Sequence, residues 1–232
     1  MGIFLRYYIK VARERKIQMN VWTIIPVKKL ENAKSSLRSV IKDEIRRKLV
    51  LAMLSDVIRA CKGCRRVERT IVVSPDEIVL EFAEKNGALS LKEPGLELNE
   101  AVKLAIKHAE ENGAQDVLIL PADLPLLKST ELEQMISMAD ERCVVIAPSK
   151  TNGTNALLIS PPSSIEPKFG GESFPRHLQE AKYRGVKVKI YHSPTVSFDL
   201  DFPEDILKVM VEGTGTETAK VISEFVNKDL TE

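Results

Sequence analysis

Three aspartates stand where their side chains could hold a metal ion together. Asp123 follows the apolar run of residues 116–120, and Asp199 and Asp201 lie two residues apart in SFDLD. Side chains alternate across an extended strand, so positions two apart point the same way and can address one ion. Carboxylate oxygens suit Mg2+, which binds through a few carboxylates plus substrate phosphates. The pattern predicts magnesium-dependent phosphate chemistry, although a turn or helix cap explains each aspartate taken alone.

An alternation of strands and helices must bring these aspartates together. Apolar runs predict strands at residues 21–27, 70–73, 88–91, 116–120, 143–147, 154–160 and 186–190. Helical spacing and capping signals predict helices after an Asp43 cap, from Asp76 to Gly87, before Gly113, from a capping box at Thr130 to Glu133, from Ser173 to Tyr183, and after Gly213. Such alternation predicts a three-layer, Rossmann-like α/β fold with a mostly parallel mixed sheet, whose ligands bind at the carboxyl ends of the strands.

Composition excludes several classes of partner. The chain of 232 residues carries 34 Lys and Arg against 33 Asp and Glu, and this formal charge of +1 gives no global field for nucleic acid or a membrane surface. No apolar run approaches the roughly 20 residues that span a bilayer. We expect a cytoplasmic protein with a basic N-terminal extension at residues 1–18 and a single domain at residues 19–232. The three cysteines are expected to be reduced thiols.

A lysine-rich loop follows the first predicted strand. It carries Lys28, Lys29, Lys34 and Arg38, which the fold would place at the carboxyl end of the sheet, where a nucleoside triphosphate needs cations. The loop lacks G-x-x-x-x-G-K-[ST], so a P-loop has no support. A solvated basic loop is the alternative.

A glycine-rich run precedes the helix that begins near Ser173. Residues 169–173 read FGGES, which supplies backbone amides and a hydroxyl at a helix start. Helix N-termini favour phosphate and carboxylate groups, so the run predicts a site for a small phosphorylated carboxylic acid. A simple N-cap at Ser173 is the alternative.

Six ordered segments resemble one enzyme family. PVKKLENAKSSL, LNEAV, LPADLPLL, GTNAL, FGGESF and FDLD occur in the order found in the 2-phospho-L-lactate guanylyltransferases, which serve coenzyme F(420) biosynthesis. The resemblance covers about residues 20–211. That family is similar to nucleotidyltransferases with a nucleoside-diphospho-sugar transferase fold, including molybdenum-cofactor guanylyltransferases. The glycine-rich signature expected of those relatives after the first strand is missing here.

The resemblance implies a role for individual residues. It assigns Asp123, Asp199 and Asp201 to Mg2+, with Lys28, Lys34 and Asp123 as the catalytic residues. It implies nucleotide contacts from Pro26, Lys28, Lys34, Ser74, Asp76 and Asn99, and acceptor contacts from Thr154, Gly170, Ser173 and His177. A helix N-cap explains Asp76 equally well, and an exposed structural histidine explains His177. Where relatives read AKSRL, this chain reads AKSSL, which leaves Arg38 to replace the arginine missing at Ser36.

The implied reaction transfers GMP from GTP to 2-phospho-L-lactate, giving lactyl-2-diphospho-5'-guanosine and pyrophosphate. Phosphoenolpyruvate and 3-phosphoglycerate are alternative acceptors, and a molybdopterin or sugar phosphate is a more distant one. A catalytically silent nucleotide-binding regulatory module is a different alternative, opposed by the retention of three mutually repelling carboxylates. Apolar residues at Ile206, Val209 and Val221 predict a homodimer. A reactive diphosphate product also suggests handover to a downstream transferase.

Overall fold

A seven-stranded sheet forms the centre of the molecule. The computed structural model describes residues 20–32 and 34–229, so the predicted extension of residues 1–18 lies outside the described residues. The strands are β1 (Val21–Pro26), β2 (Val67–Ser74), β3 (Leu89–Lys92), β4 (Asp116–Ile119), β5 (Cys143–Pro148), β6 (Thr154–Ser160) and β7 (Lys187–Ile190). Their order is β3-β2-β1-β4-β6-β5-β7. Only β6 runs antiparallel to its neighbours among these pairs, which confirms the mostly parallel mixed sheet.

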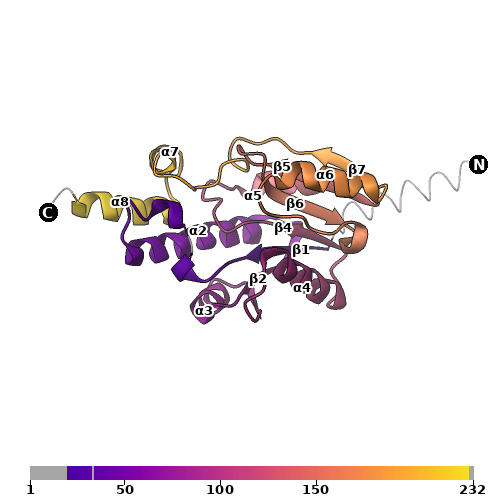
Figure 1. The fold of residues 1–232 in the computed structure, drawn as a ribbon, viewed down its shortest axis with the longest axis horizontal. Coiled ribbons are helices and arrows are strands. Elements are labelled where there is room, and N and C mark those ends of the chain that lie inside the picture. Colours follow the sequence, from indigo (N-terminus) through magenta and orange to yellow (C-terminus); the bar gives the residue numbers. More distant parts are fainter. Residues whose placement is uncertain (1–19, 33, 230–232) are drawn as a thin grey trace, which may run out of the picture.

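Helices cover both faces of this sheet (Figure 1). One face packs against α2 (Asp43–Gly63), α3 (Glu77–Lys85), α5 (Ser129–Ser137) and α8 (Glu217–Asp229), and α7 (Asp205–Glu212) contributes its buried Val209 to the same core. The other face packs against α4 (Leu98–Glu111) and α6 (Ser173–Tyr183). The two apolar cores lie on opposite sides of the sheet, which confirms the three-layer arrangement.

Strand composition follows position in the sheet. The central strand β4 is buried along its whole length, because helices cover both of its faces. The outer strands β3 and β7 are partly exposed and carry lysines, and charged side chains discourage further pairing at a sheet edge.

Two predicted helix starts are corrected by the structure. Asp43 is the first residue of α2 rather than its cap, and its carboxylate lies 2.6 Å from Arg46. The capping box predicted at Thr130 to Glu133 is displaced, because Glu131 accepts from the backbone N–H of Lys128 at 3.1 Å. A three-residue spacing lets the carboxylate reach back to the residue that precedes the helix.

The residues predicted to form a dimer surface are packed within the chain. Val209 is fully buried, and Ile206 and Val221 pack against the same core cluster. These residues thus contribute to the core of the chain itself, and the homodimer stays a prediction. None of the helices in the described part of the chain is sufficiently long and apolar to span a bilayer.

Candidate active site

A lysine from the first loop joins two distant aspartates at the carboxyl edge of the sheet. Lys34 Nζ lies 2.6 Å from Asp123 Oδ2 and 2.5 Å from Asp201 Oδ1. Strands β1 and β4 are parallel neighbours, so the segments that follow them emerge at the same edge. The backbone N–H of Leu200 donates to the Asp123 carbonyl at 3.1 Å and fixes the SFDLD segment beside it. Tertiary pairing thus assembles three of the predicted site residues.

The SFDLD segment presents its aspartates as the spacing predicts. Phe198 and Leu200 are fully buried, while Asp199 and Asp201 are partly exposed on the other side. The segment is not part of the sheet, so burial of its alternate residues, rather than strand pairing, directs the two carboxylates toward the site.

The carboxylates and the lysine shift one another's protonation. Burial alone would lower the pKa of Lys34, but the charges and hydrogen bonds of Asp123 and Asp201 outweigh it and raise the pKa. Burial and the neighbouring charges of Asp201 and Asp123 raise the pKa of Asp199 to about 6. Burial also opposes ionisation of Asp201, but Lys34 outweighs it and lowers that pKa. Three carboxyl groups act on one another here, and the charges of two lysines, Lys34 and Lys150, act on Asp201, so carboxyl groups outnumber the cations and the site attracts cations.

One atom of this cluster has no partner. Asp123 Oδ1 is buried without a hydrogen bond, the only such side-chain oxygen or nitrogen in the described ranges. Across those same ranges, no three His, Cys, Asp or Glu side chains are arranged to hold a metal ion, and Lys34 Nζ lies between Asp123 and Asp201. An unpaired buried oxygen beside excess negative charge fits a cation ligand, and the lysine occupies part of the space where the cation would sit.

The serine at the missing arginine position contacts the same segment. The Ser36 hydroxyl donates to the backbone carbonyl of Asp201. Arg38 donates to the carbonyl of Glu31 at 3.2 Å. In this structure Ser36 therefore helps to position Asp201, and the replacement of the missing arginine by Arg38 stays a prediction.

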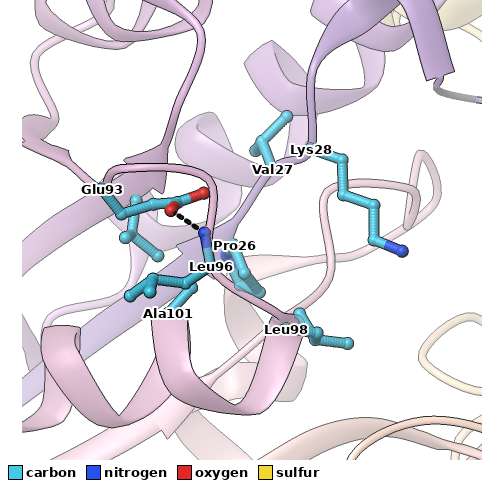
Figure 2. A pocket seen from close by; sticks show the side chains of 8 residues that line it. Pro26, Val27, Lys28, Glu93, Leu96, Leu98 and Ala101 are labelled. Atoms are coloured by element: carbon cyan, nitrogen blue, oxygen red, sulfur yellow. Dashed lines mark hydrogen bonds between the residues drawn. The ribbon is translucent and has the colours of Figure 1, made fainter.

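A pocket opens beside the carboxyl ends of β1 and β2 (Figure 2). Its walls are Pro26, Val27, Lys28, Val73, Glu93, Leu96, Leu98 and Ala101. Two of the predicted nucleotide contacts, Pro26 and Lys28, are among them. An apolar pocket with a few fixed polar groups is the usual form of a small-molecule site.

Three other predicted nucleotide residues support the surrounding backbone. The Ser74 hydroxyl accepts from the Asp76 N–H at 3.1 Å, and the Ser74 carbonyl accepts from the Glu93 N–H at 3.1 Å. Asp76 caps α3 by accepting from Ile78, and its second oxygen accepts from the Leu30 N–H, each at 3.0 Å. Asp76 thereby links the lysine-rich loop to α3, and each of its carboxylate oxygens accepts a hydrogen bond.

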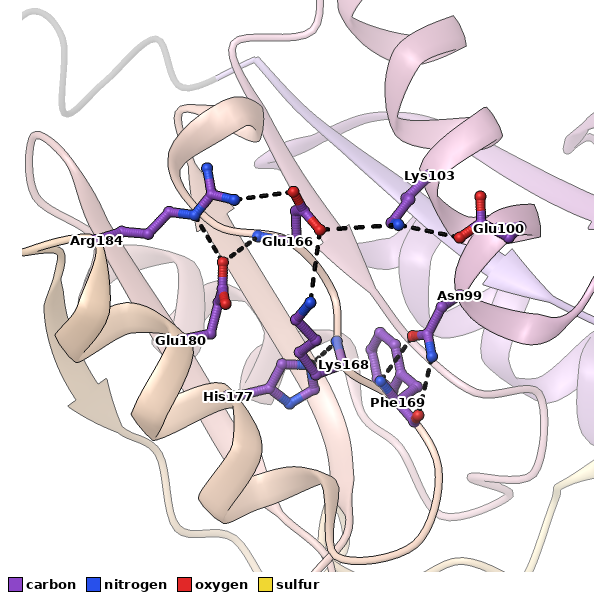
Figure 3. Close-up of polar contacts among 9 residues, drawn as sticks. All are labelled: Asn99, Glu100, Lys103, Glu166, Lys168, Phe169, His177, Glu180 and Arg184. Carbon is purple, nitrogen blue, oxygen red and sulfur yellow. Dashed lines mark hydrogen bonds and ion pairs between the residues drawn. The ribbon is translucent and has the colours of Figure 1, made fainter.

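Asn99, the third of these residues, forms hydrogen bonds with Phe169 at the start of the glycine-rich run (Figure 3). Its amide nitrogen donates to the Phe169 carbonyl at 3.1 Å, and its amide oxygen accepts from the Phe169 N–H at 2.7 Å. Because Asn99 follows the pocket residue Leu98 on α4, the same helix end borders the pocket and holds the loop that leads to Gly170.

Two of the predicted acceptor residues, Thr154 and His177, contact each other. His177 Nδ1 lies 2.9 Å from the Thr154 hydroxyl, and His177 Nε2 accepts from the Lys168 N–H at 2.9 Å. His177 is fully buried, so the alternative of an exposed histidine is wrong. Burial, reinforced by the charge of Arg176, lowers the pKa of His177 to about 4. The ring is therefore neutral near pH 7, and its acceptor nitrogen anchors the loop.

Backbone geometry also shapes the glycine-rich run. Ser173 is the first residue of α6, and Glu172 at φ 51° takes the N-cap position, so the alternative of Ser173 as N-cap is wrong. Gly170 has φ +114°, a conformation that side chains oppose, and a Cβ there would lie 3.1 Å from a guanidinium nitrogen of Arg176. Arg176 donates to the Gly171 carbonyl at 2.7 Å and stabilises this turn.

Two charged residues near the site were missed from sequence. Glu93 is a buried carboxylate in the pocket wall, and the only sequence signal was its place before Pro94 and Gly95. Lys150 lies 4.0 Å from the centre of the Phe198 ring, beside the SFDLD segment. Nothing in the local sequence distinguishes this lysine from the other surface lysines.

Comparison with known proteins identifies relatives over most of the chain. A family model described as guanylyl transferase CofC like matches residues 19–228. The phosphoenolpyruvate guanylyltransferase of Rubrobacter xylanophilus is 43% identical over 197 residues, which cover 84% of this chain and 96% of that protein. The 2-phospho-L-lactate guanylyltransferase of Methanocaldococcus jannaschii is 37% identical over 203 residues, which cover 87% of each chain.

Solved structures show the same fold at low sequence identity. A protein assigned as a nucleotide-diphospho-sugar transferase from Desulfovibrio desulfuricans has a TM-score of 0.69 at 14% identity, covering 89% of this chain and 95% of its own. A nucleotidyl transferase from Methanothermobacter thermautotroptrophicus has a TM-score of 0.67 at 15% identity, covering 85% and 99%. The expected nucleoside-diphospho-sugar transferase-like fold is confirmed.

Proposed function

The chain belongs to the CofC-like guanylyl transferase family, and on that premise we propose that it transfers GMP from GTP to 2-phospho-L-lactate in coenzyme F(420) biosynthesis. The products are lactyl-2-diphospho-5'-guanosine and pyrophosphate. The observation that carries this proposal is the meeting of Lys34 with Asp123 and Asp201 at the sheet edge onto which the Lys28 pocket also opens. Relatives named for guanylyl transfer supply the reaction class.

We propose that Asp123, Asp199 and Asp201 hold Mg2+ when GTP is bound. The unpaired Oδ1 of Asp123 and the excess of carboxyl groups support this assignment. Magnesium bound there would neutralise phosphate charge and help to orient the reacting oxygens. The bound cation would neutralise the carboxylates in place of Lys34. The ammonium group of Lys34 would then be free to bind the triphosphate.

The remaining steps need only positioning and positive charge from the chain. A phosphate oxygen of the acceptor attacks the α-phosphorus of GTP, and the bond from that phosphorus to the leaving pyrophosphate breaks. Lys28 and Lys34 offset the charge that grows on the pyrophosphate. The acceptor phosphate is already ionised near pH 7, so no general base is required.

Phosphoenolpyruvate is a second candidate acceptor. It shares the phosphate and carboxylate of 2-phospho-L-lactate, and the 43% identical relative is named for it. Either acid could bind at Thr154, Gly170 and Ser173, because both acids carry the phosphate and the carboxylate that these residues are proposed to bind.

Pyrophosphate release tests the proposal. The assay combines the protein, GTP and Mg2+ with 2-phospho-L-lactate, phosphoenolpyruvate or 3-phosphoglycerate. We expect release with the first acid, loss of at least about 100-fold in Asp123→Asn, and no change in Glu110→Gln, which alters an exposed carboxylate on α4. Release with phosphoenolpyruvate alone would show that phosphoenolpyruvate, and not 2-phospho-L-lactate, is the acceptor. No release with any acid would refute guanylyl transfer to this class of acceptor.

A further inference from the structure

Glu93 is a carboxylate held rigidly in the wall of the pocket. Its side chain and backbone together are only 4% exposed. Its Oε2 accepts from the Gly95 N–H at 2.5 Å and also from the Leu96 N–H. Its own N–H donates to the Ser74 carbonyl, so β2 fixes the residue from the other side. The direction of this carboxylate is therefore set by the fold before any ligand arrives.

The surroundings of Glu93 suit a flat base with a charged tail. Pro26, Val27, Val73, Leu96, Leu98 and Ala101 make the other pocket walls apolar. Lys28 borders the same pocket, and Figure 2 shows its side chain extending away from Glu93 on the opposite side. A nucleotide with its base against Glu93 would thus direct its phosphates toward Lys28.

One carboxylate oxygen of Glu93 accepts both hydrogen bonds from the turn, so the other oxygen can accept hydrogen bonds from a ligand. Both turn amides bind Oε2, and no hydrogen bond from the part of the chain that the structure describes engages Oε1. An ionised carboxylate oxygen only accepts hydrogen bonds. Guanine offers two donors on one edge, N1–H and the 2-amino group, whereas adenine offers an unprotonated N1 acceptor at the corresponding position.

From this geometry we propose that Glu93 Oε1 accepts from the N1–H and 2-amino edge of guanine and thereby selects GTP over ATP. This inference rests on the proposed function, because it concerns the nucleotide of that reaction. Adenine in the same pose would place its N1 acceptor against the carboxylate, and an unpaired buried polar group makes such discrimination strong. Glu93 is thus proposed to read the base, whereas both carboxylate oxygens of the predicted nucleotide contact Asp76 are engaged by backbone amides.

The Glu93→Gln variant tests the proposal by reversing one hydrogen bond. The two turn amides need an acceptor, so the glutamine carbonyl stays on the turn and its NH2 group faces the pocket. That donor opposes the guanine donors but can bind adenine N1. We expect kcat/KM for GTP to fall about 100-fold and the GTP to ATP preference to fall by at least as much. Glu97→Gln, in an exposed glutamate four residues on, should change neither.

A second measurement keeps the test independent of the variant's fold. Equilibrium binding of GTP, ATP and 1-methyl-GTP to the unaltered protein in Mg2+ should show weak binding of the latter two, because 1-methylation removes the N1 donor. Equal binding of GTP and 1-methyl-GTP, or an unchanged GTP preference in a folded Glu93→Gln protein, would overturn the proposal. A protein that binds GTP selectively but releases no pyrophosphate with any acid would overturn only the proposed function.

Discussion

Replacing Lys34 by methionine should destabilise the protein through the carboxylates that it leaves behind. Methionine keeps an unbranched side chain but carries no charge and no donor. Asp123 would then lose the partner of its Oδ2 while its Oδ1 is already unpaired, and Asp201 would lose its Oδ1 partner. The three carboxyl groups would repel one another with only the charge of Lys150 left to oppose them.

The expected loss is about 2 kcal/mol in the free energy of unfolding at pH 7 without metal. Removing one partner of a buried ion pair costs about 3 to 5 kcal/mol, whereas an exposed pair contributes about 0 to 1 kcal/mol. The Lys34 side chain is 9% exposed, but those of Asp123 and Asp201 are 25% and 42% exposed. Solvent screening at Asp201 therefore reduces the loss well below the buried limit.

Urea unfolding of the unaltered protein, Lys34→Met and Lys29→Met measures this loss. The control removes an exposed lysine of the same loop and should change stability by less than about 0.5 kcal/mol. Each protein is unfolded in EDTA and in Mg2+. Magnesium should stabilise Lys34→Met more than the unaltered protein, because a cation no longer competes with the ammonium for the carboxylates. Equal stability in EDTA, or equal stabilisation by Mg2+, would refute this account of the cluster.

Two further predictions concern Asn99 and His177. Asn99→Ala removes both hydrogen bonds to Phe169, each worth about 1 kcal/mol, so the acceptor KM should rise by up to about 30-fold with the GTP KM unchanged. Lys103→Met, which removes exposed ion pairs of α4, is the control. A raised GTP KM would instead support nucleotide binding by Asn99. His177 has a folded pKa of about 4 against about 6.5 unfolded, so the unfolded chain binds its proton first, and stability is lost as pH falls through this range. The loss in the free energy of unfolding reaches about 3 kcal/mol at most. Urea unfolding at pH 7 and pH 4.5 should show a smaller decrease in this free energy for His177→Gln than for the unaltered protein. Equal decreases in the two proteins would contradict this role of His177.

Local sequence determined the fold class and the position of the main catalytic candidates. The sequences of strands β1 and β4 are continuous apolar runs because both faces of each strand are buried. Strands that alternate with helices in this way pack as a parallel sheet covered by the helices. The parallel arrangement places the segments after β1 and β4 at one edge, which is why Lys34 and Asp123 could be predicted as neighbours from sequence order.

Tertiary structure decided what each side chain does at that edge. The spacing of Asp199 and Asp201 predicted that they share a side, but tertiary contacts, the backbone bond from Leu200 to Asp123 and the bond from Ser36 to the Asp201 carbonyl, hold Asp201 beside Lys34. The place of Glu93 before Pro94 and Gly95 indicated only a turn, because its importance comes from burial beside segments that are distant in sequence. His177 and Asn99 read as ligand contacts, and their bonds to Lys168 and Phe169 depend on a loop approach that residue spacing does not encode. Local periodicity determines which elements form, whereas the partners of a polar side chain depend on how those elements pack.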